Sequence, residues 1–280
     1  MQLWAPAKIN LSFKILGRRP DGFHEIDTLM APISLRDRLT FAYEKAPASV
    51  VEFECDDPTL PGDGDNLVVR AAELFLKAAR VNARVTITLE KQIPHGAGLG
   101  GGSSDAATTL LGLNELLDVN LSLAELIAVA AEIGSDVPFF LLRSSARCRG
   151  RGEIVSSAKV PRAFRLLLVK PDFGVPTPAA YARWQNSREL TGIDYTVQQF
   201  AGMEFCNDLE QPVFEKYVFL AEIKRWLRGQ AEVAVALLSG SGSTLFAVLH
   251  DHGDANALAE RIRVELDPKL WTCAAATVDR

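Results

Sequence analysis

A glycine-rich segment at residues 96–104, with the sequence GAGLGGGSS, constrains the fold of this chain more than any other feature. Before it, Val85, Ile87 and Leu89 alternate with polar residues, which is the period of a β-strand. After it, apolar residues over 106–117 recur at helical spacing. Glycines let a backbone approach a ligand closely, and the free N–H groups at a helix start attract anions. The sequence therefore predicts a strand, a phosphate-binding loop and a helix.

Three other interpretations of this loop fit its context less well. Gly96, Gly98 and Gly101 satisfy G-x-G-x-x-G, but a dinucleotide-binding unit needs an acidic residue at the end of a further strand, and residues 118–122 lead into another helix. A Walker loop needs Lys after its second glycine, and position 102 is Gly. A plain turn is the simplest alternative, but turns seldom need five glycines in seven residues. We therefore expect a third kind of phosphate loop.

Capping signals define three helices in the first half of the chain. Residues 103–105 (SSD) offer side-chain oxygens at the start of the helix after the glycine loop. Asp65 is placed to cap a helix over 67–78, and Ser122 with Glu125 forms a capping box for a helix that ends near Gly134.

Residues 9–15 alternate strictly between apolar and polar, which predicts a half-buried strand with Lys8 and Asn10 on its polar face. After residue 152 the pattern changes, so we expect two domains, at 1–155 and 156–280, in an α+β arrangement without strict βαβ alternation. The expected elements of the second half are strands at 164–169, 233–238, 245–249 and 272–278, a Pro-rich turn at 171–178, and helices at 217–227 and 255–266.

Composition narrows the class of function. The 280 residues carry a net charge of -5 and no basic cluster, which argues against a nucleic acid partner. The longest apolar runs are far shorter than the ~20 residues that cross a bilayer, and residues 1–9 do not resemble a targeting segment. The four cysteines are widely spaced, and His95, His250 and His252 have no third ligand at suitable spacing. We expect a cytoplasmic enzyme that acts on a small molecule.

Four segments together resemble the signatures of the GHMP kinases, a family that includes galactokinase, homoserine kinase, mevalonate kinase and phosphomevalonate kinase. They are the glycine loop and residues 6–10 (PAKIN), 134–138 (GSDVP) and 240–243 (GSGS). The resemblance implies a two-lobed GHMP kinase fold, with an N-terminal lobe like domain 2 of ribosomal protein S5 and a ferredoxin-like C-terminal lobe. It also implies phosphoryl transfer from ATP, with Mg²⁺, to a small alcohol.

Within this resemblance Asp136 is the general base, and Lys8 keeps its carboxylate ionised and orients the acceptor hydroxyl. From the pattern alone, Asp136 equally suits a helix cap beside Ser135, and Lys8 a solvated position on a strand. No side chain is assigned as a metal ligand. The nucleotide-binding residues implied are Asn66, Lys91, Pro94, His95, Gly96, Ala97, Gly98, Leu99, Gly100, Gly101, Gly102, Ser103 and Ser104.

Further segments resemble one branch of the family, whose acceptor is 4-(cytidine 5′-diphospho)-2-C-methyl-D-erythritol, in the non-mevalonate route to isoprenoid precursors. They are residues 21–24 (DGFH), 65–70 (DNLVVR), 176–178 (PTP) and 207–209 (NDL). The branch implies phosphorylation of the 2-hydroxyl, with Asn10 near that hydroxyl, His24 and Tyr181 at the cytosine, and Thr177 and Phe23 as further contacts. Position 23 is Phe where the branch often has Tyr, so one hydroxyl is absent.

Two alternatives stay open at this point. With homoserine or mevalonate as the acceptor, Lys8 and Asp136 would serve in the same way but cytidine would not bind. A regulator that binds nucleotide without catalysis would need neither residue, and the presence of both argues against it. In each case the expected partner is a small molecule, for a monomer or a weak homodimer.

Overall fold

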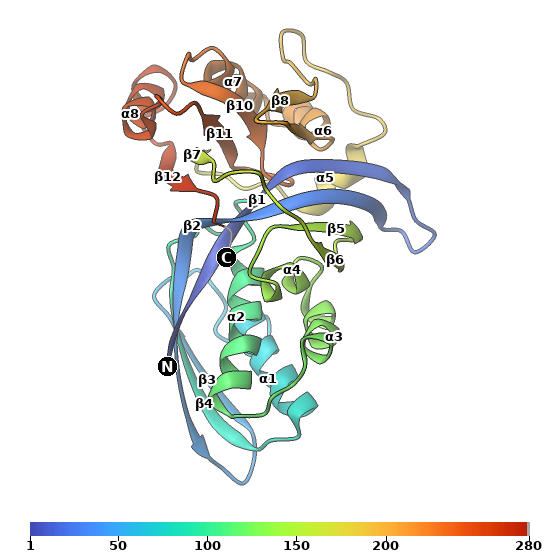
Figure 1. Ribbon diagram of the computed structural model, residues 1–280, viewed down its shortest axis with the longest axis vertical. Helices are drawn as coiled ribbons and strands as arrows, with labels where there is room; N and C mark the ends of the chain where they lie inside the picture. The colour runs from blue at the N-terminus through green and yellow to red at the C-terminus, as the bar shows by residue number, and fades with distance from the viewer. Residues whose placement is uncertain (279–280) are drawn as a thin grey trace.

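The computed structural model describes residues 1–278, so the last two residues of the expected second domain lie outside it. Two lobes follow one another along the long axis of the molecule, and the paired strands β1 and β2 run between them (Figure 1). The predicted two-lobed α+β architecture is confirmed. Among the described residues, every helix is too short or too polar to cross a bilayer.

The first sheet has eight strands, most of which belong to the N-terminal lobe. Its strand order is β3-β4-β2-β1-β9-β8; in addition, β5 pairs with β2, and β6 pairs with β5. β1 and β2 are antiparallel over most of their length, whereas β9 joins β1 only at Ser12 and Phe13. The strands are β1 (Gln2–Arg18), β2 (His24–Lys45), β3 (Val50–Cys55), β4 (Ala83–Glu90), β5 (Ala146–Gly150), β6 (Ile154–Ser157), β8 (Gln198–Phe200) and β9 (Met203–Asn207).

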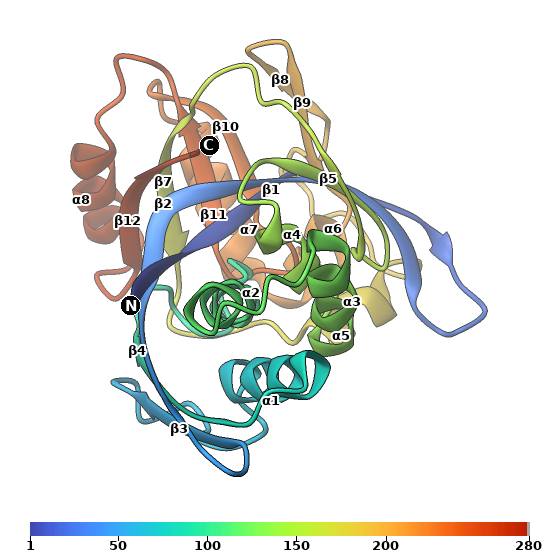
Figure 2. The same ribbon diagram turned by 60° about the horizontal axis from the view of Figure 1, so that its bottom comes forward.

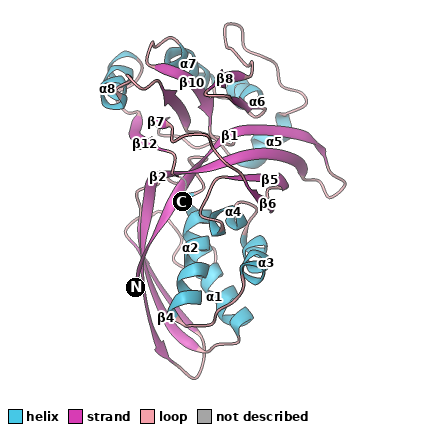
Figure 3. Ribbon diagram, in the orientation of Figure 1, coloured by secondary structure: helices cyan, strands magenta, loops and turns pink. Residues whose placement is uncertain are grey.

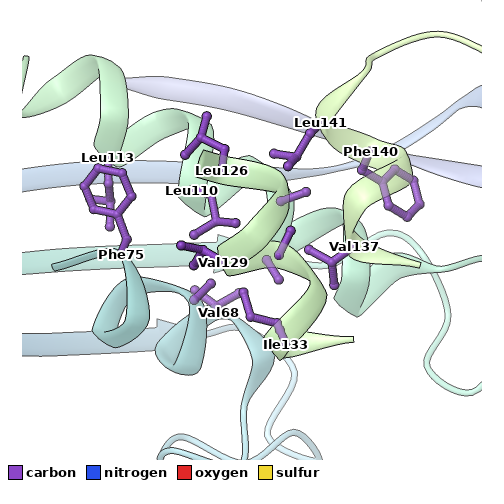
Figure 4. Close-up of a cluster of buried hydrophobic side chains, with 14 of the residues drawn as sticks. Val68, Phe75, Leu110, Leu113, Leu126, Val129, Ile133, Val137, Phe140 and Leu141 are labelled. Atoms are coloured by element: carbon purple, nitrogen blue, oxygen red, sulfur yellow. The ribbon is translucent and has the colours of Figure 1, made fainter. Parts of the chain in front are cut away.

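The sheet curves around the helices of the same lobe, α1 (Leu67–Ala79), α2 (Gly101–Leu116), α3 (Leu123–Ile133) and α4 (Val137–Leu141) (Figure 2). Their apolar faces meet in one core, in which Phe75, Leu110 and Val129 are neighbours (Figure 4). The alternation at residues 85–89 is confirmed, because every second residue of β4 is buried in this core.

Two of the predicted helix starts are shifted. α1 is capped by Asn66, whose side chain accepts a hydrogen bond from Val68 N, and not by Asp65. α2 begins at Gly101 with Gly100 as its N-cap, so residues 103–105 already lie inside the first turns and do not cap it. The helix therefore includes Gly101 and Gly102, although glycine has a low helix propensity. The capping box of Ser122 with Glu125 and the helix end at Gly134 are confirmed.

The C-terminal lobe is a ferredoxin-like sandwich. Its four-stranded antiparallel sheet has the order β10-β11-β7-β12; three helices lie in the chain between β7 and β10, and one helix follows β11 (Figure 3). The elements are β7 (Arg165–Lys170), α5 (Thr177–Arg183), α6 (Glu210–Lys216), α7 (Val218–Arg228), β10 (Val233–Leu238), β11 (Leu245–Leu249), α8 (Ala255–Glu265) and β12 (Trp271–Ala276). The predicted strands and helices of this half are present within a few residues. Residues 171–176 carry no helix or strand, as expected of a turn, but α5 begins at Thr177, so it includes the last two residues of the predicted turn, and it was not predicted.

Both faces of this second sheet are covered, which explains why β7 is continuously apolar. Leu167 and Val169 face the cluster formed with α7 and α8. Leu166 and Leu168 belong to a separate cluster with residues of β1, including Ile9. The second cluster joins the lobes and buries the apolar face of β1. Lys8 and Asn10 on the other face are buried as well, so the strand is not half-buried at these positions, contrary to what its alternation predicted.

Candidate active site

Two cavities meet at Ser103, the residue that lines both of them. The larger, about 730 Å³, lies between the turn that joins β1 to β2, the start of α4, and α5. The smaller, about 330 Å³, lies along the glycine loop and the start of α1. We call them the acceptor cavity and the nucleotide cavity.

The glycine loop forms one wall of the nucleotide cavity, which residues 94–103 line without a break. Gly96, Gly98 and Gly100 have φ between 63° and 74°, the left-handed region that favours glycine. A Cβ on Gly98 would lie 2.3 Å from Ser239 O, so the loop packs tightly against the C-terminal lobe as well. The loop leads straight into α2, a 16-residue helix whose first N–H groups have no intrahelical partner. This geometry suits an anionic ligand.

Ser104 lies just beyond this wall. It is fully buried, does not line either cavity, and its hydroxyl has no hydrogen-bond partner among the described residues.

Asp136 lines the acceptor cavity, and Lys8, which does not line either cavity, links Asp136 to the glycine loop. Lys8 Nζ is 3.7 Å from Asp136 Oδ2, and it donates to Asn10 Oδ1 at 2.8 Å and to Gly98 O at 3.0 Å. The Lys8 side chain is 5% exposed, whereas that of Asp136 is 38% exposed and lines the acceptor cavity. Burial lowers the pKa of Lys8, although Asp136 opposes that shift by favouring the ammonium form. A carboxylate open to a ligand is thus held beside a buried cation.

Asn10 lies behind Lys8 and away from the acceptor cavity. Its amide oxygen accepts from Lys8, its Nδ2 donates to Thr28 Oγ1 at 2.8 Å, and that hydroxyl donates onward to Ser12 O. The side chain is 1% exposed, and both its oxygen and its nitrogen are engaged within the protein. The expected direct contact with the acceptor hydroxyl is not what this placement favours; it favours a role in positioning Lys8.

Aromatic side chains line the far end of the acceptor cavity. His24 stacks on Tyr181 with ring centroids 5.0 Å apart and meets Trp184 edge-on at 5.8 Å. Burial and the nearby Arg18 lower the pKa of His24, so this imidazole is neutral near pH 7 and offers both a donor and an acceptor. Phe23 is 52% exposed, with the guanidinium of Arg151 over its ring at 4.9 Å.

Sequence reasoning missed several residues of the acceptor cavity, namely Arg18, Arg151, Gln185 and Asn186. Among the described residues, Arg18 and Arg151 are the only arginines or lysines that line it. Their signal was weak, since each stands beside a turn among other charged residues. Thr177 lines the same cavity, and its hydroxyl lies 2.8 Å from that of Ser241, which links α5 to the β10–β11 loop.

Lys91 and Asn66 line the nucleotide cavity, but both side chains are already engaged. Lys91 Nζ forms an ion pair with Asp37 and another, at 2.9 Å, with Asp105. Desolvation and the neighbouring Asp37 raise the pKa of Asp105 to about 8, although Lys91 opposes the shift. Asn66 caps α1 and donates to Pro61 O, and His95 is exposed at the cavity wall. These contacts hold the wall of the cavity in place.

Within residues 1–278, no three His, Cys, Asp or Glu side chains gather as a metal site would require.

Comparison with known families matches both lobes. The family described as GHMP kinases N terminal domain matches residues 66–144, and the family described as GHMP kinases C terminal matches residues 197–266. A crystal structure of homoserine kinase from Cytophaga hutchinsonii superposes with a TM-score of 0.71 at 18% identity, covering 100% of this chain and 94% of that one, which supports the fold alone.

Three proteins that are 35–43% identical to this chain are named as the same kinase. The 4-diphosphocytidyl-2-C-methyl-D-erythritol kinase of Methylacidiphilum infernorum is 43% identical over 274 residues, 96% of this chain and 93% of that protein. The enzyme of the same name from Protochlamydia amoebophila is 39% identical over 89% of this chain and 84% of its own. A crystal structure of 4-(cytidine 5'-diphospho)-2C-methyl-D-erythritol kinase covers 99% of this chain and 100% of its own, with a TM-score of 0.78 and 35% identity. The chain therefore belongs to the GHMP kinases and, within them, to the 4-diphosphocytidyl-2-C-methyl-D-erythritol kinase family.

Proposed function

We propose that this kinase transfers the γ-phosphoryl group of ATP to the 2-hydroxyl of 4-(cytidine 5′-diphospho)-2-C-methyl-D-erythritol. The observation that carries the proposal is that Asp136, which lines the acceptor cavity, pairs with Lys8, whose ammonium also donates to Gly98 O in the wall of the nucleotide cavity. A hydroxyl bound in the acceptor cavity would reach Asp136 while facing the glycine loop. Homoserine and mevalonate lack a cytidine group, so they would leave the aromatic end of a 730 Å³ cavity unfilled.

Asp136 accepts the proton of the acceptor hydroxyl as the oxygen attacks phosphorus. Its carboxylate is open to the cavity, and the Lys8 ammonium beside it favours the ionised form that a base requires. Lys8 is itself fixed by Asn10 and by Gly98 O, so the pair and the phosphate loop are held in one arrangement. A base of this kind contributes about 10²–10⁴-fold in rate.

The N–H groups of the glycine loop and of the start of α2 bind the triphosphate of ATP. The residues fit a Mg²⁺ ion that would be held mainly by phosphate oxygens, because Ser103 places a hydroxyl in the wall of the nucleotide cavity near the start of α2. Ser103 would supply the protein oxygen, since the unpartnered Ser104 hydroxyl is enclosed behind this wall. When bound, Mg²⁺ offsets negative charge on the phosphates.

The acceptor cavity suits a cytidine diphosphate compound in two further ways. Arg18 and Arg151 supply positive charge for the diphosphate, and guanidinium groups match phosphate oxygens well. His24 offers hydrogen bonds to the edge of the pyrimidine, while Tyr181 and Phe23 offer ring faces for stacking. Thr177 lines the same space.

We also propose that the enzyme works in the cytoplasm, where ATP and cytidine nucleotides are available, as a monomer or weak homodimer. Its net charge of -5 disfavours nucleic acid as a partner.

The Asp136→Asn variant tests the chemical assignment. The amide keeps the size of the side chain but cannot accept the proton, so kcat should fall at least 10²-fold while the affinity for ATP, measured by calorimetry, stays within twofold. Asp118→Asn is the matched control, because Asp118 follows α2 at φ 51°, a conformation that Asn adopts readily, and does not line either cavity. Near-normal turnover in Asp136→Asn would remove Asp136 from the role of base.

A further inference from the structure

A third cavity, about 350 Å³, takes no part in the reaction described above. It lies over the N-terminal end of β1 and the middle of β2, against α2 and the end of α4. Its apolar surface comes from Trp4, Pro6, Leu111 and Phe140 among others. A volume of this size is in the range of sites for small organic ligands. We call it the rear cavity.

Two arginines line the rear cavity, and none of its described lining residues, which end at Val278, has an acidic side chain. Arg36 lies flat over the Trp4 ring, 4.2 Å from its centroid, and Arg143 follows directly after α4. Both arginines are exposed, and in the described part of the chain neither has a carboxylate within ion-pair distance. Trp4 is 44% exposed, although it is a large aromatic residue at the start of a strand. An apolar hollow with unneutralised guanidinium groups favours an organic anion over a neutral compound.

Phe140 connects the rear cavity to the active site. Its ring lines the rear cavity on one side, and on the other it contacts the phosphate loop so closely that a Cβ on Gly100 would lie 2.9 Å from Phe140 Cζ. The same position lies 3.1 Å from Lys8 Cγ. A ligand that presses on the Phe140 ring therefore acts on the loop and on Lys8 without an intermediate layer.

We propose that the rear cavity is a regulatory site for a small organic anion with an apolar body, carrying a phosphate or carboxylate group. The apolar body lies against Trp4, Leu111 and Phe140, and the anionic group pairs with Arg36 and Arg143. Occupancy shifts Phe140 and changes the affinity of the glycine loop for ATP. The binding part of the proposal is independent of the proposed function, whereas the regulatory part rests on it.

The test uses 1-naphthyl phosphate as the probe, with the full-length protein saturated in a non-hydrolysable ATP analogue, Mg²⁺ and cytidine diphosphate to fill the other two cavities. Calorimetry should show one site that binds 1-naphthyl phosphate at least tenfold more tightly than 1-naphthol or inorganic phosphate. Comparing its affinity with that of 1-naphthoate shows whether the site prefers a phosphate or a carboxylate group. Arg36→Ala and Arg143→Ala should each weaken binding at least fivefold. The control Arg188→Ala, an exposed arginine that does not line the rear cavity, should leave it unchanged.

Equal affinity for 1-naphthol and 1-naphthyl phosphate, or unchanged affinity in both arginine variants, would overturn the anion site. The regulatory part is tested by kinetics in the absence of the analogue, where 1-naphthyl phosphate should change KM for ATP at least twofold in the wild type and not in Arg143→Ala. Binding at the rear cavity with no change in KM for ATP would overturn the regulation. Failure of the proposed function would appear separately, as absence of turnover without any probe.

Discussion

Gly100 is a position of the phosphate loop at which a side chain would displace Phe140 and Lys8. It has φ 69°, and a Cβ there would lie 2.9 Å from Phe140 Cζ and 3.2 Å from Lys8 Cε. Gly102, two residues on, is inside α2, and its Cβ would meet only Leu67 Cδ1, at 3.5 Å. The variants Gly100→Ala and Gly102→Ala therefore add the same methyl group to the same segment with opposite expected results.

The cost of Gly100→Ala has two parts. A non-glycine residue in the left-handed region costs about 1–2 kcal/mol. Forcing a methyl group against a packed ring and a buried lysine stem adds about 1–3 kcal/mol. The free energy of unfolding should thus fall by about 2–5 kcal/mol, which for a chain of this size lowers Tm by roughly 3–8 °C. In Gly102→Ala the helix gains a residue of higher propensity, so stability should rise by up to about 1 kcal/mol.

Differential scanning calorimetry measures both variants, and steady-state kinetics follows KM for ATP. Because the displaced groups are Phe140 and Lys8, we expect Gly100→Ala to raise KM for ATP and to lower kcat as well, whereas Gly102→Ala, at a position that lines the nucleotide cavity, serves as the control for stability alone. If Gly100→Ala matched the wild type in Tm and in kcat, the packing of Phe140 and Lys8 against the loop would be refuted.

Three further predictions concern charged groups. Lys8→Met should lower kcat about 10²-fold or more, whereas Lys14→Met, at an exposed lysine on the same strand, should leave kcat unchanged. Because the pKa of Lys8 is lowered, the fall of wild-type kcat at alkaline pH should begin below the usual lysine value of 10.5. The pKa of Asp105 is about 8 in the folded protein and 3.8 in the unfolded chain, so between these values only the folded state holds the proton. The free energy of unfolding, measured in urea, should therefore decrease from about pH 4 to about pH 8, and Asp105→Asn should flatten that profile. Arg151→Ala should raise KM for the cytidine substrate about tenfold without changing KM for ATP, since one charge-assisted contact is lost, and Arg149→Ala, whose side chain pairs with Asp27, should not. An unchanged kcat in Lys8→Met, an unchanged pH profile in Asp105→Asn or an unchanged KM for the cytidine substrate in Arg151→Ala would contradict the role assigned to that residue.

Local patterns predicted those parts of the fold whose stability is local. The capping box at Ser122 and the alternation in β4 involve neighbours in sequence, and both are present. The helix α5 was not predicted, and the expected turn was extended over its first two residues because of Pro178, yet proline suits the first turn of a helix, where its missing N–H has no partner. The short strands β8 and β9 carry too few residues for a period to show.

The environment of the site could not be predicted, because it depends on contacts between distant segments. The alternation at residues 9–15 places Lys8 on a polar face, but the β10–β11 loop covers that face, with Gly240 so close that a Cβ on it would lie 3.4 Å from Lys8 Nζ. Asp37, Lys91 and Asp105 form one buried charge cluster although 68 residues separate its ends, and no spacing rule joins them. Family resemblance supplied the identity of the residues, whereas the structure supplies their partners.

The measurement that tests the central claim most directly is ADP release by the purified protein with Mg-ATP and 4-(cytidine 5′-diphospho)-2-C-methyl-D-erythritol, run beside homoserine and mevalonate as rival acceptors. The pairing of Asp136, which lines the acceptor cavity, with Lys8, which donates to Gly98 O of the glycine loop, predicts turnover with the cytidine compound and none above background with the other two. Turnover with homoserine or mevalonate and none with the cytidine compound would contradict the assigned acceptor, and no turnover with any of the three would contradict catalysis at this site.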